Sequence, residues 1–130
     1  MPKPPFLALL LLLLISSTPF PTACARSFVC NLDKFFTYDP FAYSLAHLLD
    51  ELVEFGSVEP GENFYHKTHD DNIGSPAYGR SSCSGSLTVH DCHSCLKLAV
   101  KAMKRWCHMA IGGQVELGEC GLRYEQYEFV

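Results

Sequence analysis

Residues 83–95, CSGSLTVHDCHSC, place three cysteines at the spacing C-x8-C-x2-C, with His90, Asp91 and His93 between them. This spacing fits three kinds of site: a metal centre, a redox pair or part of a disulfide framework. These three kinds of site differ in the cellular compartment and in the additional residues that they require. The rest of the chain therefore decides among them.

The first 25 residues have the pattern of a secretory signal peptide. Lys3 precedes an apolar run at 6–15, and Ala23 and Ala25 fit a signal-peptidase site. A membrane-spanning helix needs roughly 20 apolar residues, so this run is too short to span a bilayer. We expect secretion to the extracellular space, with residues 1–25 removed and a single domain at 26–130.

Removal of the signal changes the cysteine count. Of seven cysteines Cys24 would be lost, and 7 − 1 = 6 remain. An even number in an oxidising compartment favours three disulfides, but the spacing alone leaves many pairings open. The six cysteines are Cys30, Cys83, Cys92, Cys95, Cys107 and Cys120.

The charge of the predicted mature chain excludes some classes of partner. Loss of Lys3 leaves 10 − 1 = 9 basic residues against 14 acidic ones, a net charge of −5. A mildly acidic surface argues against nucleic-acid binding and against a cationic membrane-disrupting peptide. No second apolar run is long enough for a membrane span.

Residues 40–56 are predicted to form the first helix. Asp39 is a suitable N-cap, Pro40 fits the first helical position, and Gly56 can end the helix. Apolar residues recur there at helical spacing and predict a core-facing stripe of Phe41, Leu45, Leu48, Leu49, Leu52 and Phe55. His47 lies between the stripe positions and is expected on the helix surface.

Two short strands are predicted between the helices, at 63–69 and 77–83, because breakers such as Pro60, Gly74 and Pro76 separate runs of β-forming residues. The polar run HKTHDDN, residues 66–72, contains two histidines and two aspartates. A metal site is one interpretation of this run. An exposed turn between strands is the simpler one, and we favour it.

A second helix is predicted to begin at Thr88, which stands at capping-box spacing from Asp91, and to close at Gly112-Gly113. Trp106, near its C-terminal end, is expected to pack at the rim or in the core. The predicted buried face comprises Cys92, Cys95, Leu96, Ala99, Val100, Met103, Cys107 and Ala110. Basic residues mostly occupy the opposite face, which is most simply solvated: Lys97, Lys101, Lys104 and Arg105.

The last segment, 114–129, alternates with period two, as expected of strands with one wet face. Its predicted core face is Val115, Leu117, Cys120, Leu122 and Tyr124, and its polar face is Gln114, Glu116, Arg123 and Glu125. Together the patterns predict an α+β fold: two helices packed on a roughly five-stranded antiparallel sheet and stapled by three disulfides.

Neither a metal nor a redox site is favoured at 83–95. Zinc sites usually combine two ligand pairs, and only Cys92-x2-Cys95 is present. A redox C-x2-C needs a strand leading directly into it, whereas here a capped helix has begun. No G-x-S-x-G, H-E-x-x-H or comparable motif occurs. We therefore predict no cofactor and no catalytic activity.

Several blocks resemble the plant cysteine-rich DUF26, or Gnk2-homologous, domain family. They are the C-x8-C-x2-C stretch, AYGRSSC before it, the block from Cys107 to AIGGQVEL, and the closing YEQYEF. The resemblance is strongest to the single-domain, ginkbilobin-like branch of secreted antifungal lectins. It implies three disulfide pairs: Cys30–Cys107, Cys83–Cys92 and Cys95–Cys120.

The same resemblance implies a mannose site built from an asparagine, an arginine and a glutamate. The matching positions are Asn31, Gln114 and Glu125, so glutamine stands where the family pattern has arginine. Arg123, on the same strand face as Glu125, could partly supply the missing charge. The resemblance thus implies a plant defence protein that binds mannose or mannan-type glycans of the fungal cell wall. The alternative is a non-catalytic extracellular module that binds a protein partner and no sugar.

Overall fold

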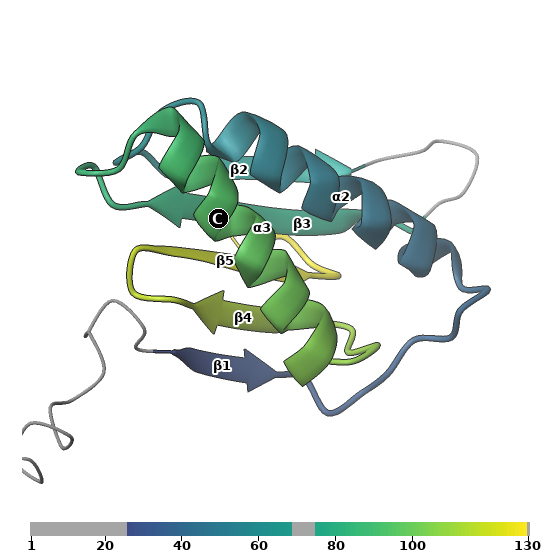
Figure 1. Cartoon of the computed structure of the whole chain (residues 1–130). Helices are drawn as coiled ribbons and strands as arrows, with labels where there is room; N and C mark the ends of the chain where they lie inside the picture. The colour runs from purple at the N-terminus through teal and green to yellow at the C-terminus, as the bar shows by residue number, and fades with distance from the viewer. Residues whose placement is uncertain (1–25, 69–74, 130) are drawn as a thin grey trace, which may run out of the picture.

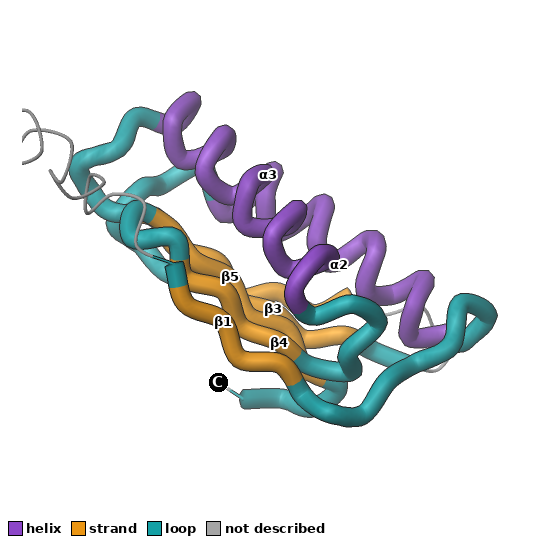
Figure 2. The backbone as a smooth tube through the Cα atoms, turned by 60° about the horizontal axis from the view of Figure 1, so that its bottom comes forward, coloured by secondary structure: helices purple, strands orange, loops and turns teal. Residues whose placement is uncertain are grey.

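The computed structural model describes residues 26–68 and 75–129, which form two helices and one five-stranded antiparallel sheet. The strands lie in the order β1-β4-β5-β3-β2, and both helices cover the same face of the sheet (Figures 1 and 2). The predicted α+β fold is confirmed. The elements are β1 (Ser27–Cys30), α2 (Pro40–Gly56), β2 (Phe64–Thr68), β3 (Ala77–Cys83), α3 (Val89–Trp106), β4 (Gly113–Glu116) and β5 (Cys120–Glu125).

Helix α2 begins as the sequence predicts, because a carboxylate oxygen of Asp39 accepts from the Phe41 N–H at 3.1 Å. The predicted stripe is buried except at Phe55, which is 56% exposed, and that prediction is wrong. Val53, 7% exposed, is buried in its place. Helix α3 packs on the flank of α2 that carries Val53, whereas Phe55 lies beside Phe64 of β2, at the edge of the sheet.

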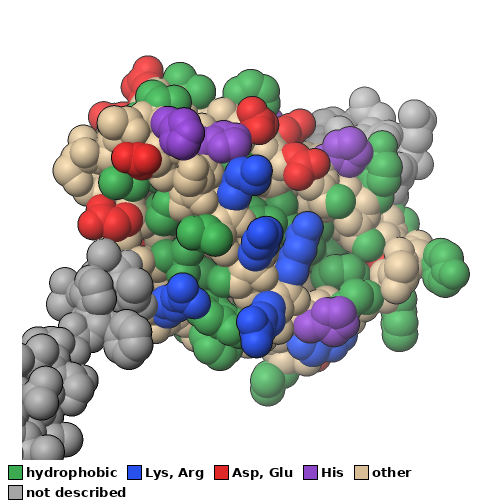
Figure 3. Space-filling model, in the orientation of Figure 1, with side chains coloured by type: hydrophobic (Ala, Val, Ile, Leu, Met, Phe, Trp, Pro, Cys, Tyr) green, Lys and Arg blue, Asp and Glu red, His purple; other side chains and the backbone are tan. Residues whose placement is uncertain are grey.

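Helix α3 also starts as predicted, since the Thr88 hydroxyl accepts from the Asp91 N–H at 3.1 Å. It ends at Trp106 and not at Gly112-Gly113, because Cys107 is bonded to Cys30 of β1 and the chain turns there. Its basic side chains gather on the exposed face of the helix, as Figure 3 shows: Lys97, Lys101, Lys104 and Arg105. The Trp106 ring stacks on Phe28 at 4.9 Å, which is rim packing.

The hydrophobic core lies between the helices and the inner face of the sheet. Alternation along β4 and β5 buries the predicted residues Val115, Leu117, Cys120, Leu122 and Tyr124. At Gly79 of β3 a side chain would collide with Leu48 and Leu52, so glycine lets α2 approach the sheet. The Tyr124 hydroxyl donates to the Ala110 carbonyl at 2.6 Å, and burial raises the pKa of Tyr124.

Three disulfides tie α3 and the residue that follows it to the sheet: Cys30–Cys107, Cys83–Cys92 and Cys95–Cys120. They are the three pairs that the family resemblance implies. The C-x8-C-x2-C stretch therefore holds α3 against β3 and β5. Its histidines lie at the surface: His90 is exposed, and His93 contacts Glu54 of α2 at 3.1 Å.

The polar run at 66–72 is only partly described. His66, Lys67 and Thr68 belong to β2, and His66 pairs with Glu51 of α2, whereas 69–72 lie outside the described residues. Within residues 26–68 and 75–129, no three side chains of histidine, cysteine, aspartate or glutamate gather as a metal site would require. No helix in the same part of the chain is long and apolar enough to cross a membrane.

Candidate functional site

The face of the sheet opposite α2 and α3 brings Asn31 and Glu125 into one row across neighbouring strands. Cys30 pairs with Gly113, and Gly113 pairs with Tyr124. One residue further, the Asn31 N–H donates to the Gly112 carbonyl at 2.9 Å, so Asn31, Gly112 and Glu125 follow one another. Side chains two strands apart are separated by roughly 10 Å, the width of a small polar ligand and its contacts.

Gly112 is the reason that Glu125 can lie flat on this face. A Cβ atom at position 112 would overlap the Glu125 carboxylate, so the carboxylate occupies the space that any other residue would fill. The Glu125 side chain is only 13% exposed. Its carboxylate therefore lies against the surface of the sheet and is largely shielded from solvent.

Arg123 also contacts the Glu125 carboxylate. Its Nε lies 3.2 Å from a Glu125 oxygen, and its side chain is 26% exposed. The segment after β5 runs along the open face of the sheet (Figure 2). From that segment the Tyr127 hydroxyl lies 3.3 Å from an Arg123 nitrogen, and the Phe129 ring centre lies 4.1 Å from the guanidinium carbon. The contacts with Tyr127 and Phe129 hold the guanidinium over the sheet, next to Glu125.

Gln114 lies on the same face but in the neighbouring row, opposite Arg123 on one side and Val29 on the other. Its amide nitrogen is 3.4 Å from a Glu116 oxygen, so the side chain points away from Glu125. The guanidinium beside Glu125 thus comes from Arg123 and not from position 114.

The Asn31 side chain is exposed and partly engaged in a local turn. Its carbonyl oxygen accepts from the Asp33 N–H at 2.9 Å, which fixes the direction of the side-chain amide. The amide N–H2 group remains at the surface as a donor. The strand register thus places Asn31, Gln114 and Glu125 on one face, without a direct hydrogen bond among their side chains.

Two residues of this face escaped the sequence analysis. Gly112, which the sequence suggested only as a helix stop, leaves the space that the Glu125 carboxylate occupies. Tyr78 of β3 stands directly opposite Glu125 and borders a hollow of about 330 Å³ together with Tyr65, Lys67 and Glu128. The signal for Tyr78 is its alternation with buried Ala77 and Gly79 along β3.

Comparison with known proteins decides the family. Residues 29–127 match the salt stress response/antifungal family. The chain belongs to this family. The C-x8-C-x2-C stretch and the three disulfides are therefore those of a salt stress response/antifungal domain, and the resemblance drawn from the sequence is confirmed.

Two relatives show how closely the chain follows this family. An antifungal ginkbilobin-like protein of Picea abies is 33% identical over 104 residues, which cover 79% of this chain and 94% of the relative. Antifungal protein ginkbilobin-2 of Ginkgo biloba is 31% identical over 123 residues, which cover 94% and 87%. Both relatives are named for antifungal action.

Solved structures show the same fold in a larger setting. The tandem DUF26 ectodomains of the Arabidopsis thaliana cysteine-rich receptor-like proteins PDLP8 and PDLP5 align with TM-scores of 0.72 and 0.70 at 24% and 25% identity. Each alignment covers 80% of this chain, which spans 49% and 50% of the two ectodomains. The chain corresponds to about half of either ectodomain.

Proposed function

We propose that this member of the salt stress response/antifungal family is a secreted antifungal defence protein that binds mannose-type glycans of the fungal cell wall. The proposed binding surface is the open face of the sheet around Asn31, Gln114 and Glu125. The observation that carries the proposal is the Glu125 carboxylate, held between Gly112 and Arg123 in the same row as Asn31.

The chemistry of this row suits a hexose. Sugar hydroxyls both donate and accept, so a site needs a carboxylate acceptor, a strong donor and a group that can do both. Glu125 is the acceptor, Arg123 the charged donor and the Asn31 amide the third group. Hydrogen bonds to charged groups are about twice as strong as neutral ones, which favours a fixed carboxylate and guanidinium.

Arg123 supports sugar binding despite the glutamine at 114. The family pattern has its arginine at that position, and its loss would leave Glu125 without a charged neighbour. Since the Arg123 Nε lies 3.2 Å from Glu125, a guanidinium is nevertheless present, reached from β5 instead of β4. We expect the altered direction of the donor to change sugar preference and to weaken mannose binding relative to an arginine at 114.

An aromatic ring beside the polar row adds to the case. Tyr78 lies opposite Glu125 and borders the 330 Å³ hollow. The apolar faces of sugar rings pack on aromatic side chains while the hydroxyls reach polar groups. A chain of several mannose units could extend from Glu125 towards Tyr78, which fits a mannan better than a single sugar.

Secretion is part of the proposal. Three disulfides are typical of extracellular proteins, and the leader at 1–25 has the signal-peptide pattern. We infer that the mature chain begins at Arg26 and acts outside the cell, in the apoplast.

The second candidate function is an extracellular interaction module that binds protein. Edge strand β1 and the chain after it expose large apolar side chains, among them Leu32 at 93% and Tyr38 at 98%. Exposed edges and apolar patches are common features of protein-binding surfaces. Leu32 directly follows Asn31 in the chain, so one protein could present both surfaces.

A glycan array probed with the purified mature protein separates the two functions. We expect signal on mannose polymers and oligomannose, and loss of that signal in Glu125→Gln. A protein that binds no glycan, but retains a protein partner through the β1 edge, would reject the lectin function in favour of the interaction module.

A further inference from the structure

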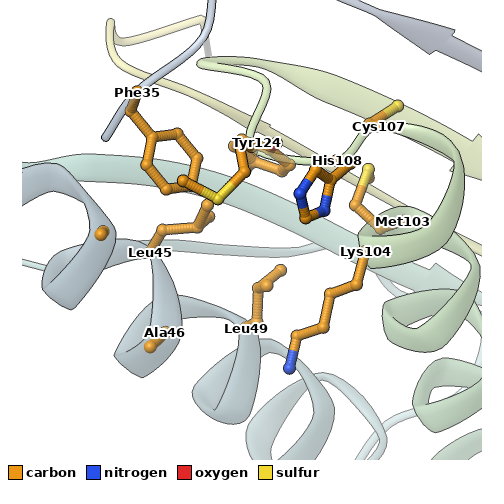
Figure 4. Close-up of a pocket in the computed structure, with 11 residues that line it drawn as sticks. Phe35, Leu45, Ala46, Leu49, Met103, Lys104, Cys107, His108 and Tyr124 are labelled. Carbon is orange, nitrogen blue, oxygen red and sulfur yellow. The ribbon is translucent and has the colours of Figure 1, made fainter. Parts of the chain in front are cut away.

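A pocket of about 290 Å³ opens on the helix side of the sheet, where the N-terminal half of α2 faces the C-terminal end of α3 (Figure 4). At their other ends the helices are tied by the contact between His93 and Glu54. The walls of the pocket are almost entirely apolar, with principal contributions from Phe35, Leu45, Leu49, Met103, Met109 and Tyr124.

The polar groups of the pocket suit an anion. In the part of the chain that the structure describes, the titratable side chains that line it are Lys104, His108 and Tyr124, and no carboxylate does. In Figure 4 the Lys104 and His108 side chains lie on the α3 side of the pocket, where the Lys104 chain runs from α3 towards α2; both residues are exposed. The Lys34 ammonium group donates to the His108 carbonyl at 2.8 Å and adds a further positive charge near the mouth. Among the described residues, no carboxylate forms an ion pair with Lys104.

The backbone at Met109 is unusual. Its φ of 57° lies in the left-handed region, which favours glycine, and Met109 is the only non-glycine residue with positive φ in the described part of the chain. The Phe35 N–H donates to the Met109 carbonyl at 2.9 Å and helps to hold this turn. Methionine supplies an adaptable apolar surface there.

From these observations we propose that the pocket binds a small amphipathic carboxylic acid. The apolar body would lie against Leu45, Leu49 and Met109, and the carboxylate would face Lys104 and His108. A cavity of about 150 Å³ accommodates benzene, so this pocket suits an aromatic acid or a medium-chain fatty acid of about ten carbons.

This site is separate from the proposed sugar site. Tyr124 contributes to the pocket from β5, whereas its neighbours Arg123 and Glu125 point to the opposite face of the sheet. Occupation of the pocket and binding of a glycan can therefore be measured independently. Failure of one leaves the other intact.

Methionine methyl NMR tests the proposal directly, because Met103 and Met109 both line the pocket and are the only methionines after Met1. We expect decanoate or cinnamate, added below micelle-forming concentration, to shift both signals saturably with one site. The relative affinity of the two acids tells an aliphatic from an aromatic ligand. Absence of saturable shifts with both acids would overturn the proposal.

Charge selection is the second part of the test. Lys104→Gln should weaken binding of the preferred acid by about tenfold, because it removes the cationic partner of the carboxylate. Lys97→Gln, an equal charge change on the exposed face of α3 outside this pocket, should leave the affinity unchanged. Equal binding of 1-decanol and decanoate, or an equal loss in Lys97→Gln, would contradict recognition of a carboxylate.

Discussion

The Arg123 guanidinium donates to the Glu125 carboxylate at 3.2 Å, two residues along the same strand and on the face of the sheet opposite α2 and α3. Tyr127 and Phe129 hold the guanidinium from above. This arrangement gives the protein a fixed charged donor beside a fixed acceptor, although position 114 carries glutamine. The proposed mannose site depends on this pair.

Arg123→Gln should weaken binding of methyl α-mannoside by about tenfold or more, because it removes both a donor to the sugar and the partner that orients Glu125. The fold should persist, since Arg123 lies outside the core. Arg80→Gln is the matched control: Arg80 faces Arg123 across the strands and has the same charge, but it forms no ion pair with Glu125. Equal losses in the two variants, measured by calorimetric titration, would indicate a general effect of charge.

Gln114→Arg should raise the affinity for mannose by about 1 kcal/mol or more, because it adds a donor capable of charge-assisted bonds. Arg123 stands directly opposite, and like charges in a cross-strand pair are unfavourable. The gain should therefore be larger in the Arg123→Gln background, where position 123 no longer places a positive charge directly opposite position 114. A double variant that binds no better than Arg123→Gln alone would show that position 114 does not face the sugar.

Gly112→Ala tests whether sugar binding depends on the position of the Glu125 carboxylate, without changing any side chain that is proposed to contact the sugar. The new methyl group would displace the Glu125 carboxylate, and we expect mannose binding to fall while the thermal transition changes little. Gly121→Ala offers a matched control, because a side chain there would overlap the Glu116 carboxylate in the same way. Retained binding in Gly112→Ala would mean that the position of Glu125 is unimportant.

Local signals in the sequence predict most of the fold. The caps Asp39 and Thr88 define the helix starts, and period-two alternation identifies both faces of β4 and β5. Phe55 was misassigned because helical periodicity does not show which flank of α2 is covered by α3. The edge strand β1 is only four residues long and mostly exposed, so it has no alternating pattern to reveal it.

The candidate site is less accessible to sequence reasoning. The family pattern identifies positions 31, 114 and 125, and strand alternation places Arg123 beside Glu125. The directions of the side chains depend on three-dimensional neighbours: Gln114 turns to Glu116, and the Asn31 carbonyl oxygen turns to the Asp33 N–H. The pocket beside Met109 depends on how two helices diverge, which no local pattern encodes.

Removal of the Cys30–Cys107 disulfide should destabilise the fold more than removal of Cys83–Cys92. The cysteines of the first disulfide are separated by 77 positions in the sequence, and those of the second by 9. The chain-entropy relation then gives a difference of about 2 kcal/mol in the free energy of unfolding. Urea unfolding of the paired Cys→Ala variants measures it. A larger loss on removing Cys83–Cys92 would contradict the expectation.

Strong reductant should lower the thermal transition sharply, whereas a chelator should leave it unchanged. The six cysteines that follow residue 25 are all bridged, so reduction releases three cross-links. Bound metal would instead make the stability sensitive to chelation. A transition that falls with EDTA and resists reductant would restore the metal interpretation of the histidine-containing segments.

Intact-mass measurement of the secreted protein tests the predicted processing. We expect a chain that begins at Arg26 and lacks six hydrogens, two for each of the three disulfides. Retention of residues 1–25 in the secreted protein would show that the leader is not a cleaved signal.

The most direct test of the proposed function is calorimetric titration of the wild-type protein and Glu125→Gln with methyl α-mannoside. Glutamine keeps the size of the side chain but replaces the charged carboxylate, which accepts hydrogen bonds from Arg123 and, in the proposed site, from the sugar. We predict saturable binding by the wild type and at least a tenfold weaker affinity in the variant, with thermal transitions that coincide within a few degrees. Equal affinities, or no binding by the wild type, would contradict a mannose site at Glu125.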